Sequence, residues 1–308
     1  MEQPEAARMT CFSGRRPAVT VVIVTHNEGE NLRRTVDGFR KSIAEGDEIV
    51  IVDDFSTDGS VDFLDDGYRD IRVIRPGRLL SVMSARNLGA SVAAGDVIVH
   101  SDAHVDPSPG LLDPLIAALD DPEVGQVGPA IGVRDNPGHA PGYGYTWGNA
   151  GLQVKWLHRK GDAAYDVPII CSCCMAMRRD VYQATGGLDE GLTRWGSAEQ
   201  ELSLRLWLLG YRCRVVPESH AGHMFRKKFP YKVEWTGVIF NLLRMVTVHF
   251  SGPAAARVIA HFAKEPAFAK AWTLLAGSDT WARKAQMDAL RHRSFDWFVN
   301  RFEIEAFV

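Results

Sequence analysis

The sequence lacks the features of several common protein classes. Its 308 residues contain no uninterrupted apolar run of the roughly 18 residues that a membrane-spanning helix needs. Residues 1–17 have no apolar core of the kind found in a secretory signal, and we expect them to form a disordered tail. The net charge is only −3, which gives no electrostatic reason to expect nucleic acid as a partner. These absences predict a globular protein without a transmembrane span.

Cysteine is scarce, and its pattern argues against a disulfide framework. There are five cysteines, and an odd number in a chain without an export signal favours reduced thiols in the cytoplasm. The cluster Cys171-Ser172-Cys173-Cys174 could hold a metal ion. It lies in an apolar run, however, and no second cysteine pair matches it. We therefore favour small buried thiols at this position.

Two common nucleotide-binding patterns are also missing. No G-x-G-x-x-G follows the first predicted strand, and the chain contains no G-x-x-x-x-G-K-[ST]. This argues against dinucleotide-dependent dehydrogenases and P-loop enzymes. In their place, acidic residues follow the first two predicted strands, in Thr25-His26-Asn27-Glu28 and in Asp53-Asp54. Carboxylates at these positions can accept hydrogen bonds from a nucleoside, so Thr25, Asn27, Glu28 and Asp54 are candidate nucleotide-sugar contacts.

Short β-branched runs alternate with helix-like stretches from residue 18 onward. Strands are predicted at residues 19–25, 48–52, 71–74, 96–100, 169–177 and 212–216, and helices at 31–42, 58–64, 81–94 and 198–209. Such alternation is typical of βαβ units and of a mostly parallel sheet covered on both faces. Residues 124–168 are expected to be irregular, with two strands at most. The last segment, residues 230–308, is predicted to be a helical extension to a domain spanning 18–229.

A candidate metal site follows the fourth predicted strand, in Asp102-Ala103-His104. In an extended segment, residues i and i+2 point the same way, so Asp102 and His104 converge. A carboxylate beside an imidazole suits a divalent cation, Mn2+ in preference to Mg2+, which would neutralise a diphosphate leaving group. Either His220 or His223, after the last predicted strand, could supply a third ligand.

Other candidate residues lie at the ends of the same predicted elements. The guanidinium groups of Arg86 and Arg226 can support a base or bind a diphosphate in bidentate fashion. Glu199 falls in the first turn of a predicted helix, where the helix dipole keeps it anionic and suited to act as a general base. Ser101 and Trp195 adjoin these motifs and are further candidates for contact with a nucleotide sugar.

Taken in order, these pieces resemble family 2 glycosyltransferases of the GT-A fold. The resemblance covers about residues 18–228. The matching segments are Thr25-x-Asn27-Glu28, Val52-Asp53-Asp54-x-Ser56-x-Asp58-Gly59, Arg86-Asn87-x-Gly89 and Gly186-Gly187-Leu188-Asp189.

Three motifs are closest to those of the polypeptide N-acetylgalactosaminyltransferases. They are Asp102-Ala103-His104, the stretch from Trp195-Gly196 to Glu201, and Gly222-His223-Met224-Phe225-Arg226. The resemblance implies that His223 completes the metal site and that Arg226 touches the diphosphate. The middle stretch departs from the pattern of these retaining enzymes, because Glu199 stands where many inverting family 2 enzymes place their base. This favours inversion.

The resemblance implies transfer of a hexose or N-acetylhexosamine from a UDP-sugar to an unknown acceptor, which could be a protein, a peptide, a glycan or a small molecule. A sugar-nucleotide hydrolase and a non-catalytic sugar-nucleotide-binding protein are the alternatives. Packing against the main domain is the default role for the helical extension. Its apolar helices could instead form a homodimer interface, an acceptor clamp or a membrane-surface patch.

Overall fold

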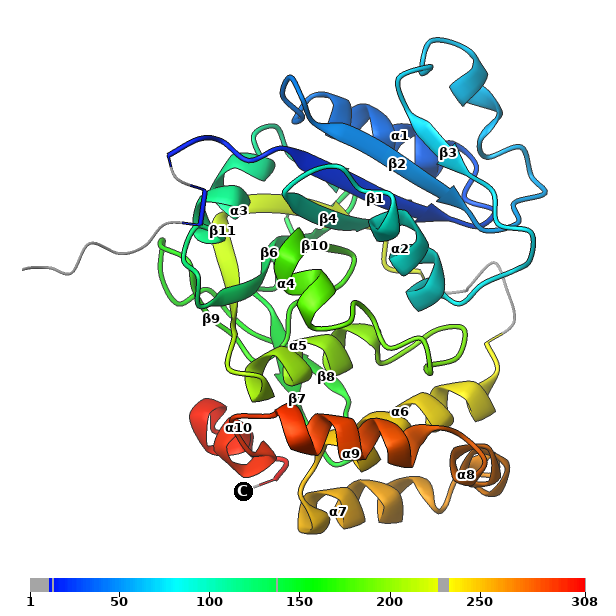
Figure 1. Cartoon of the computed structure of the whole chain (residues 1–308), viewed down its shortest axis with the longest axis vertical. Coiled ribbons are helices and arrows are strands. Elements are labelled where there is room, and N and C mark those ends of the chain that lie inside the picture. The colour runs from blue at the N-terminus through cyan, green and yellow to red at the C-terminus, as the bar shows by residue number, and fades with distance from the viewer. Residues whose placement is uncertain (1–10, 13, 137, 227–232, 308) are drawn as a thin grey trace, which may run out of the picture.

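The structure, a computed structural model, describes residues 11–12, 14–136, 138–226 and 233–307. It consists of a twisted sheet covered by helices, with a further layer of helices beyond α5 (Ala198–Leu208), as Figure 1 shows. The strand order in the sheet is β3-β2-β1-β4-β10-β6-β11-β5, and β9 pairs with β11. The arrangement confirms the expected α/β class.

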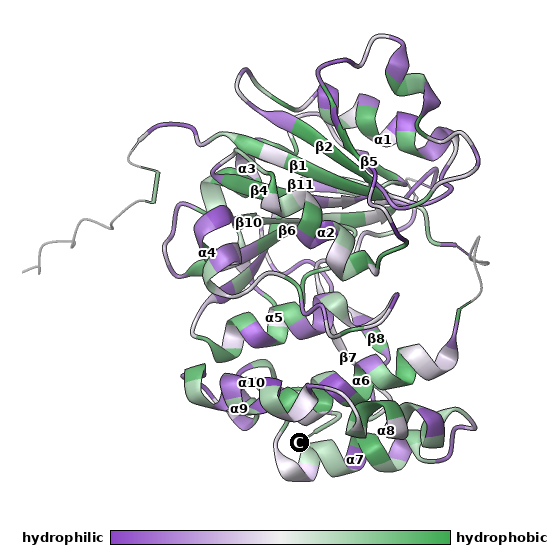
Figure 2. Cartoon of the chain, turned by 45° about the vertical axis from the view of Figure 1, so that its right-hand side comes forward, coloured by the Kyte–Doolittle hydropathy of each residue, from purple (hydrophilic) through white to green (hydrophobic). Residues whose placement is uncertain are grey.

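The first half of the chain contributes four mutually parallel strands and one short strand at the far edge of the sheet. Its elements are β1 (Val19–Thr25), α1 (Glu30–Arg40), β2 (Glu48–Asp53), a 3-10 helix (Asp62–Asp65), β3 (Arg72–Ile74), α2 (Val82–Ser91), β4 (Val97–Asp102), β5 (Val105–Pro107) and α3 (Leu112–Ala118). The helix predicted at 58–64 is thus reduced to one short 3-10 turn. Figure 2 shows that apolar residues dominate β1 and β2.

Both faces of this sheet are buried, which explains its continuous β-branched runs. In β1, Val21 packs into the core beneath α1 and α3, while its neighbour Val22 packs into the core beneath α2 and α5. Helix α2 lies very close to the sheet. A Cβ on Gly89 would lie 2.3 Å from Cγ1 of Val22, so only glycine fits at this position.

The second half of the chain has more strands than its sequence predicts. Its elements are β6 (Val124–Val133), β7 (Tyr145–Trp147), β8 (Val154–Trp156), β9 (Tyr165–Asp166), β10 (Cys174–Arg178), α4 (Arg179–Ala184), α5 and β11 (Arg212–His223). β10 runs antiparallel to β4 and β6, and β5 and β9 run antiparallel to β11, so the sheet is mixed. The strand predicted at 169–177 begins only at Cys174, because the chain turns at residues 172–173.

The last strand also differs from the prediction in a way that affects the candidate site. The sequence predicted that this strand ends at Val216. It instead continues, through an irregularity between Val216 and His220, as far as His223. Gly222 pairs with Asp106 of β5 in the sheet. His223 is therefore held by strand pairing rather than by a flexible loop.

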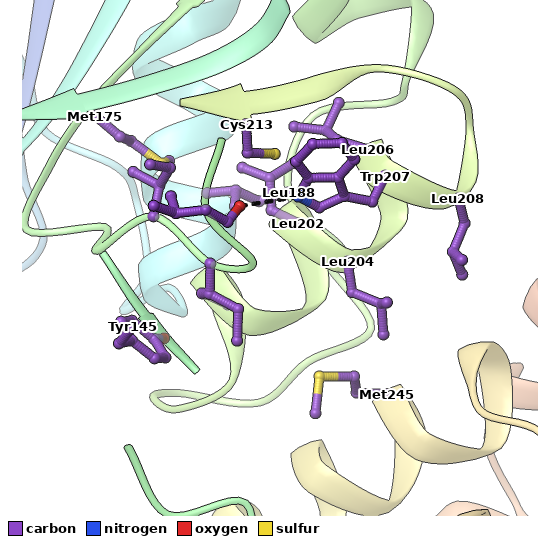
Figure 3. Close-up of a cluster of buried hydrophobic side chains, with 14 of the residues drawn as sticks. Tyr145, Met175, Leu188, Leu202, Leu204, Leu206, Trp207, Leu208, Cys213 and Met245 are labelled. Atoms are coloured by element: carbon purple, nitrogen blue, oxygen red, sulfur yellow. Dashed lines mark hydrogen bonds between the residues drawn. The ribbon is translucent and has the colours of Figure 1, made fainter. Parts of the chain in front are cut away.

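The C-terminal helices pack onto the sheet domain. They are α6 (Trp235–His249), α7 (Gly252–Phe262), α8 (Phe268–Ala276), α9 (Thr280–Leu290) and α10 (Phe295–Phe302). One apolar cluster contains Leu204 of α5, Met245 of α6 and Phe298 of α10. Figure 3 shows Met245 near Leu204 of α5. The predicted boundary near residue 230 lies outside the described residues.

A buried polar network also joins α5 to α6. Glu201 pairs with Arg205 one turn along α5, with 2.8 Å between Oε1 and Nε, and His249 of α6 contacts the same Glu201 oxygen at 2.9 Å. Burial acts to raise the pKa of Glu201, but the charge of Arg205 and the contact with His249 lower it well below 4.5. A buried carboxylate with these partners remains ionised and fixes α6 relative to α5.

The N-terminal segment is more ordered than predicted where it is described. The backbone N–H of Phe12 donates to Oδ1 of Asp120 over 3.0 Å, and the Phe12 ring is buried in the core. Arg16 pairs with Asp47 at 2.9 Å. The expected disordered tail is therefore wrong for residues 11–12 and 14–17, and residues 1–10 lie outside the described part. Among the described helices, none has both the length and the hydropathy to cross a membrane.

Candidate active site

A cavity of about 570 Å³ opens where the carboxyl ends of β1, β2 and β4 meet the end of β11. In open α/β sheets this edge is where ligands bind. The wall contains nine of the candidate residues predicted from the sequence: Glu28, Asp54, Arg86, Asp102, His104, Trp195, Glu199, His223 and Arg226. His26, which lies between candidate residues in the sequence, also lines it.

Asp102, His104 and His223 form a group that could hold a metal ion. One potential ligand atom from each lies within 4.8 Å of the others. Nε2 of His223 lies 3.5 Å from Oδ2 of Asp102, and Nε2 of His104 lies 4.0 Å from the same oxygen. The second histidine of β11, His220, is exposed and does not belong to this group.

Strand pairing explains why His104 and His223 meet. β5 begins directly after His104, and its first residue, Val105, pairs with His223 across the antiparallel β5–β11 ladder. The backbone N–H of Met224 also donates to the carbonyl oxygen of His104 over 3.2 Å. The two imidazole rings lie 4.9 Å apart, centroid to centroid. Two segments more than 100 residues apart in sequence are thereby joined at one point.

His223 and Arg86 together keep Asp102 ionised. Arg86 contacts it directly. Its Nη2 donates to Oδ1 of Asp102 over 2.6 Å and to the carbonyl oxygen of Ser172 over 2.9 Å. Burial acts to raise the pKa of Asp102. The hydrogen bond from His223 and the charge of Arg86 outweigh it and lower the pKa well below 3.8. Asp102 is thus an anion at neutral pH, as a metal ligand must be.

Glu28 lies between two other site residues. It forms an ion pair with Arg226, and its Oε1 lies 3.3 Å from Nδ1 of His104. The backbone N–H of Glu28 donates a hydrogen bond to the Ser60 hydroxyl over 2.9 Å. A carboxylate beside the ring nitrogen of a candidate metal ligand orients that imidazole. Glu28, expected at the nucleoside, therefore has its carboxylate at the metal-capable group.

Asp54 and His26 form another part of the wall. Oδ1 of Asp54 accepts a hydrogen bond from the Leu80 backbone N–H at 2.7 Å, and Nδ1 of His26 contacts the Asp54 carbonyl oxygen at 2.6 Å. Burial raises the pKa of Asp54. Both residues line the cavity. His26 belongs to the motif Thr25-His26-Asn27-Glu28, but it was not among the residues predicted to contact the nucleotide sugar.

Three residues that were expected to contact the nucleotide sugar, Thr25, Asn27 and Ser101, do not line the cavity. Thr25 is buried in the sheet. The side-chain oxygen of Asn27 accepts from the Thr57 backbone N–H at 2.7 Å, and the Ser101 hydroxyl donates to the Asp102 carbonyl oxygen at 2.9 Å. These side chains hold loops and strands in place and do not line the cavity, so their contact with a nucleotide sugar stays a prediction.

Glu199 lies across the cavity in the first turn of α5. The Ser172 hydroxyl donates to its Oε2 over 3.4 Å. Burial, followed by the negative charge of Glu199, raises the pKa of Tyr145 well above 10, so Tyr145 remains a neutral phenol near this carboxylate. Neighbouring Gln200 accepts a hydrogen bond from Nε1 of Trp147 at 2.8 Å, which fixes the start of the helix.

The comparisons with known proteins agree with this geometry. Residues 20–186, more than half of the chain, match the family described as Glycosyl transferase family 2. The chain belongs to glycosyltransferase family 2. A second match, over residues 156–238, carries the description N-terminal domain of galactosyltransferase.

Curated relatives of this family 2 chain include polypeptide N-acetylgalactosaminyltransferases. The human polypeptide N-acetylgalactosaminyltransferase 10 is 28% identical over 97% of this chain and 52% of its own length. The Drosophila melanogaster polypeptide N-acetylgalactosaminyltransferase 8 is 33% identical over 68% of this chain and 38% of its own length. This family 2 chain thus spans about half the length of the curated relatives it matches, or less.

Solved structures support the GT-A fold of this family 2 chain. A crystal structure of GalNAc-T7 with UDP, GalNAc and Mn2+ superposes with a TM-score of 0.79 and 25% identity, covering 94% of this chain and 57% of that one. TarS from S. aureus in complex with UDP-GlcNAc shares the fold with a TM-score of 0.58 at 15% identity, covering 84% of this chain and 71% of that one.

Several residues at the family 2 site escaped the sequence interpretation. Besides His26, the wall contains Tyr145, Trp156, Cys171 and Cys173. The two aromatic residues come from the segment predicted to be irregular, where no periodic pattern pointed to β7 and β8. The cysteines were interpreted as buried thiols, because nothing local shows that the chain turns there and opens onto the cavity. The only available signal was the high aromatic content of residues 143–156.

Proposed function

We propose that this chain is a metal-dependent glycosyltransferase that moves a hexose or an N-acetylhexosamine from a UDP-sugar to an acceptor hydroxyl. The observation that carries the proposal is the convergence of Asp102, His104 and His223 on one cavity that also contains Glu199. The related GalNAc-T7 was crystallised with UDP, GalNAc and Mn2+, which supports the same donor chemistry here.

The residues present fit a divalent cation. Asp102 is held anionic, and Nδ1 of His223 is buried without a hydrogen-bond partner among the described residues. One carboxylate and two imidazoles suit Mn2+ better than Mg2+, which prefers oxygen ligands. When bound, the cation would neutralise the diphosphate leaving group as a Lewis acid.

Different side chains would contact different parts of the UDP-sugar. Asp54 and His26 would contact the nucleoside through the free carboxylate oxygen and the imidazole. Arg226 would bind the diphosphate, because Glu28 already fixes one side of its guanidinium. Arg86 would act through Asp102 rather than on the donor.

Glu199 would serve as the general base. As a carboxylate in the first turn of α5, it would remove the proton from the acceptor hydroxyl as that oxygen attacks the anomeric carbon, with inversion. Aromatic side chains of Trp156, Trp195 and Phe225 line the cavity and offer apolar surface to the acceptor. Which class of acceptor the chain uses is determined by measuring activity with candidate acceptors.

The test is UDP release from a panel of UDP-sugars with Mn2+, with and without candidate acceptors. His223→Ala is expected to abolish metal-dependent release. His220→Ala is the matched control, since His220 is an exposed histidine three residues earlier on the same strand, and it should retain activity. Failure of every UDP-sugar to bind in the presence of Mn2+ would overturn the proposal.

Two other outcomes separate the alternatives. Equal UDP release with and without any acceptor would identify a sugar-nucleotide hydrolase. Binding of a UDP-sugar without release under any condition would identify a non-catalytic binding protein. Either result would contradict a transferase.

A further inference from the structure

Two thiols face each other inside the candidate site. The Sγ atoms of Cys171 and Cys173 lie 3.4 Å apart, and both residues line the cavity. Cys171 is half-buried at the wall and Cys173 is buried behind it. We propose that Cys171 and Cys173 form a reversible disulfide in response to a peroxide, and that this bond switches the site off.

The local backbone allows the two sulfurs to close. A disulfide needs about 2.05 Å between its sulfur atoms, so the present separation must shrink by about 1.4 Å. The chain turns at residues 172–173, and β10 begins only at Cys174. The closure can therefore take place within the turn, without breaking the pairing of β10 with β4.

The chemistry needs one peroxide and no other reactant. The thiolate of Cys171, the more accessible sulfur, attacks one peroxide oxygen, and the O–O bond breaks to release hydroxide and leave a sulfenic acid on Cys171. The Cys173 sulfur, having given up its proton, attacks the Cys171 sulfur, forms the S–S bond and expels a second hydroxide. Both hydroxides are protonated, so two thiols are oxidised while the peroxide is reduced to two waters.

The turn that carries the two cysteines also holds the candidate catalytic groups. Arg86 donates to the Ser172 carbonyl oxygen at 2.9 Å, and the Asp102 backbone N–H donates to the Cys173 carbonyl oxygen at 2.9 Å. The Ser172 hydroxyl contacts Glu199. Closing a ring around Ser172 rotates these peptide groups, and a shift of about 1 Å can lower turnover by roughly 100-fold. This effect on turnover rests on the proposed glycosyltransferase function, whereas formation of the bond does not.

The bond can be tested directly by mass spectrometry. After treatment of the full chain with hydrogen peroxide and alkylation of remaining thiols, the tryptic peptide 161–178 should carry a disulfide and one alkylated cysteine. Cys171→Ser and Cys173→Ser should each prevent the disulfide. Cys174→Ser is the matched control, because Cys174 points into the sheet core beside the pair, and it should leave the disulfide intact. Absence of the disulfide in the native chain would overturn the proposal.

The switch is tested by UDP release before and after peroxide, each variant being compared with its own untreated sample. The native chain should lose up to about 100-fold of its turnover and regain it with dithiothreitol, while Cys171→Ser and Cys173→Ser should not respond. A disulfide that forms without changing turnover would overturn the switch. If no UDP-sugar is turned over at all, the proposed function fails. The switch is then tested by calorimetric measurement of Mn2+ binding. Oxidation should weaken Mn2+ binding, because the Cys173 carbonyl oxygen accepts a hydrogen bond from the Asp102 backbone N–H.

Discussion

Arg86 and Asp102 form a charge-assisted hydrogen bond of 2.6 Å at the wall of the cavity. Arg86 is 2% exposed, so its guanidinium is shielded from solvent and strongly favours the ionised carboxylate. The same carboxylate faces His104 and His223. The sequence predicts that this arginine supports the base or the diphosphate; from its contacts we infer that it positions the metal-capable group.

Replacing Arg86 should therefore weaken metal binding. Arg86→Met removes the donor that orients Asp102 and lowers its pKa, and we expect Mn2+ affinity to fall by about 10- to 100-fold in calorimetry. Arg69→Met, at an exposed arginine, is the control and should leave the affinity unchanged. Unaltered Mn2+ binding in a folded Arg86→Met variant would argue that Arg86 does not act through Asp102.

Glu199→Gln should remove the general base while retaining size and hydrogen bonding. We expect UDP release in the presence of acceptor to fall by about 100- to 10,000-fold. Affinity for Mn2+ should not change, because Glu199 is not part of the metal-capable group. Glu218→Gln, at an exposed glutamate on β11, provides the comparison. Full activity of Glu199→Gln would mean that another group accepts the proton.

Glu201→Gln should destabilise the whole chain rather than affect the chemistry. It leaves Arg205, which is fully buried, without its charged partner, and such a change costs about 3–5 kcal/mol. Urea unfolding followed by circular dichroism measures the loss. Glu265→Gln, on the exposed end of the α7–α8 connection, should change stability little. A loss equal to that of the control would show that Arg205 finds other partners.

The chain should lose stability as the pH falls below about 6.5. Burial lowers the pKa of His249, with Glu201 partly offsetting it, and burial lowers that of His100 well below 6.5. The unfolded chain then binds more protons than the folded one, so the free energy of unfolding decreases with falling pH by up to about 1.4 kcal/mol per unit for each group.

Thermal unfolding between about pH 6.5 and pH 5 tests this, because most carboxylates remain ionised there. His249→Gln should reduce the slope of stability against pH. His261→Gln, at an exposed histidine on α7, should keep the native slope. If His249→Gln and the native chain show the same slope, His249 is not the group that titrates.

The local pattern of the sequence was sufficient for the core of the fold. Buried strands such as Val19–Thr25 were predictable because a strand covered on both faces must be apolar at every position. Asp102 and His104 could be paired from their spacing alone, since side chains two residues apart in extended backbone share a face. The family motifs extended this to His223 and Arg226.

Only the tertiary structure decided which site residues from distant parts of the sequence come into contact. That His104 meets His223 depends on the antiparallel pairing of β5 with β11, and β5 is too short to leave a periodic signal in the sequence. The roles of Glu28, Arg86 and the Cys171–Cys173 pair depend on partners 16 to 198 residues away, or on a turn within an apolar run. Hydrophobic periodicity reports only which face of an element is buried. Which polar groups meet at the end of that element follows from strand order and register, and these are fixed by contacts distant in sequence.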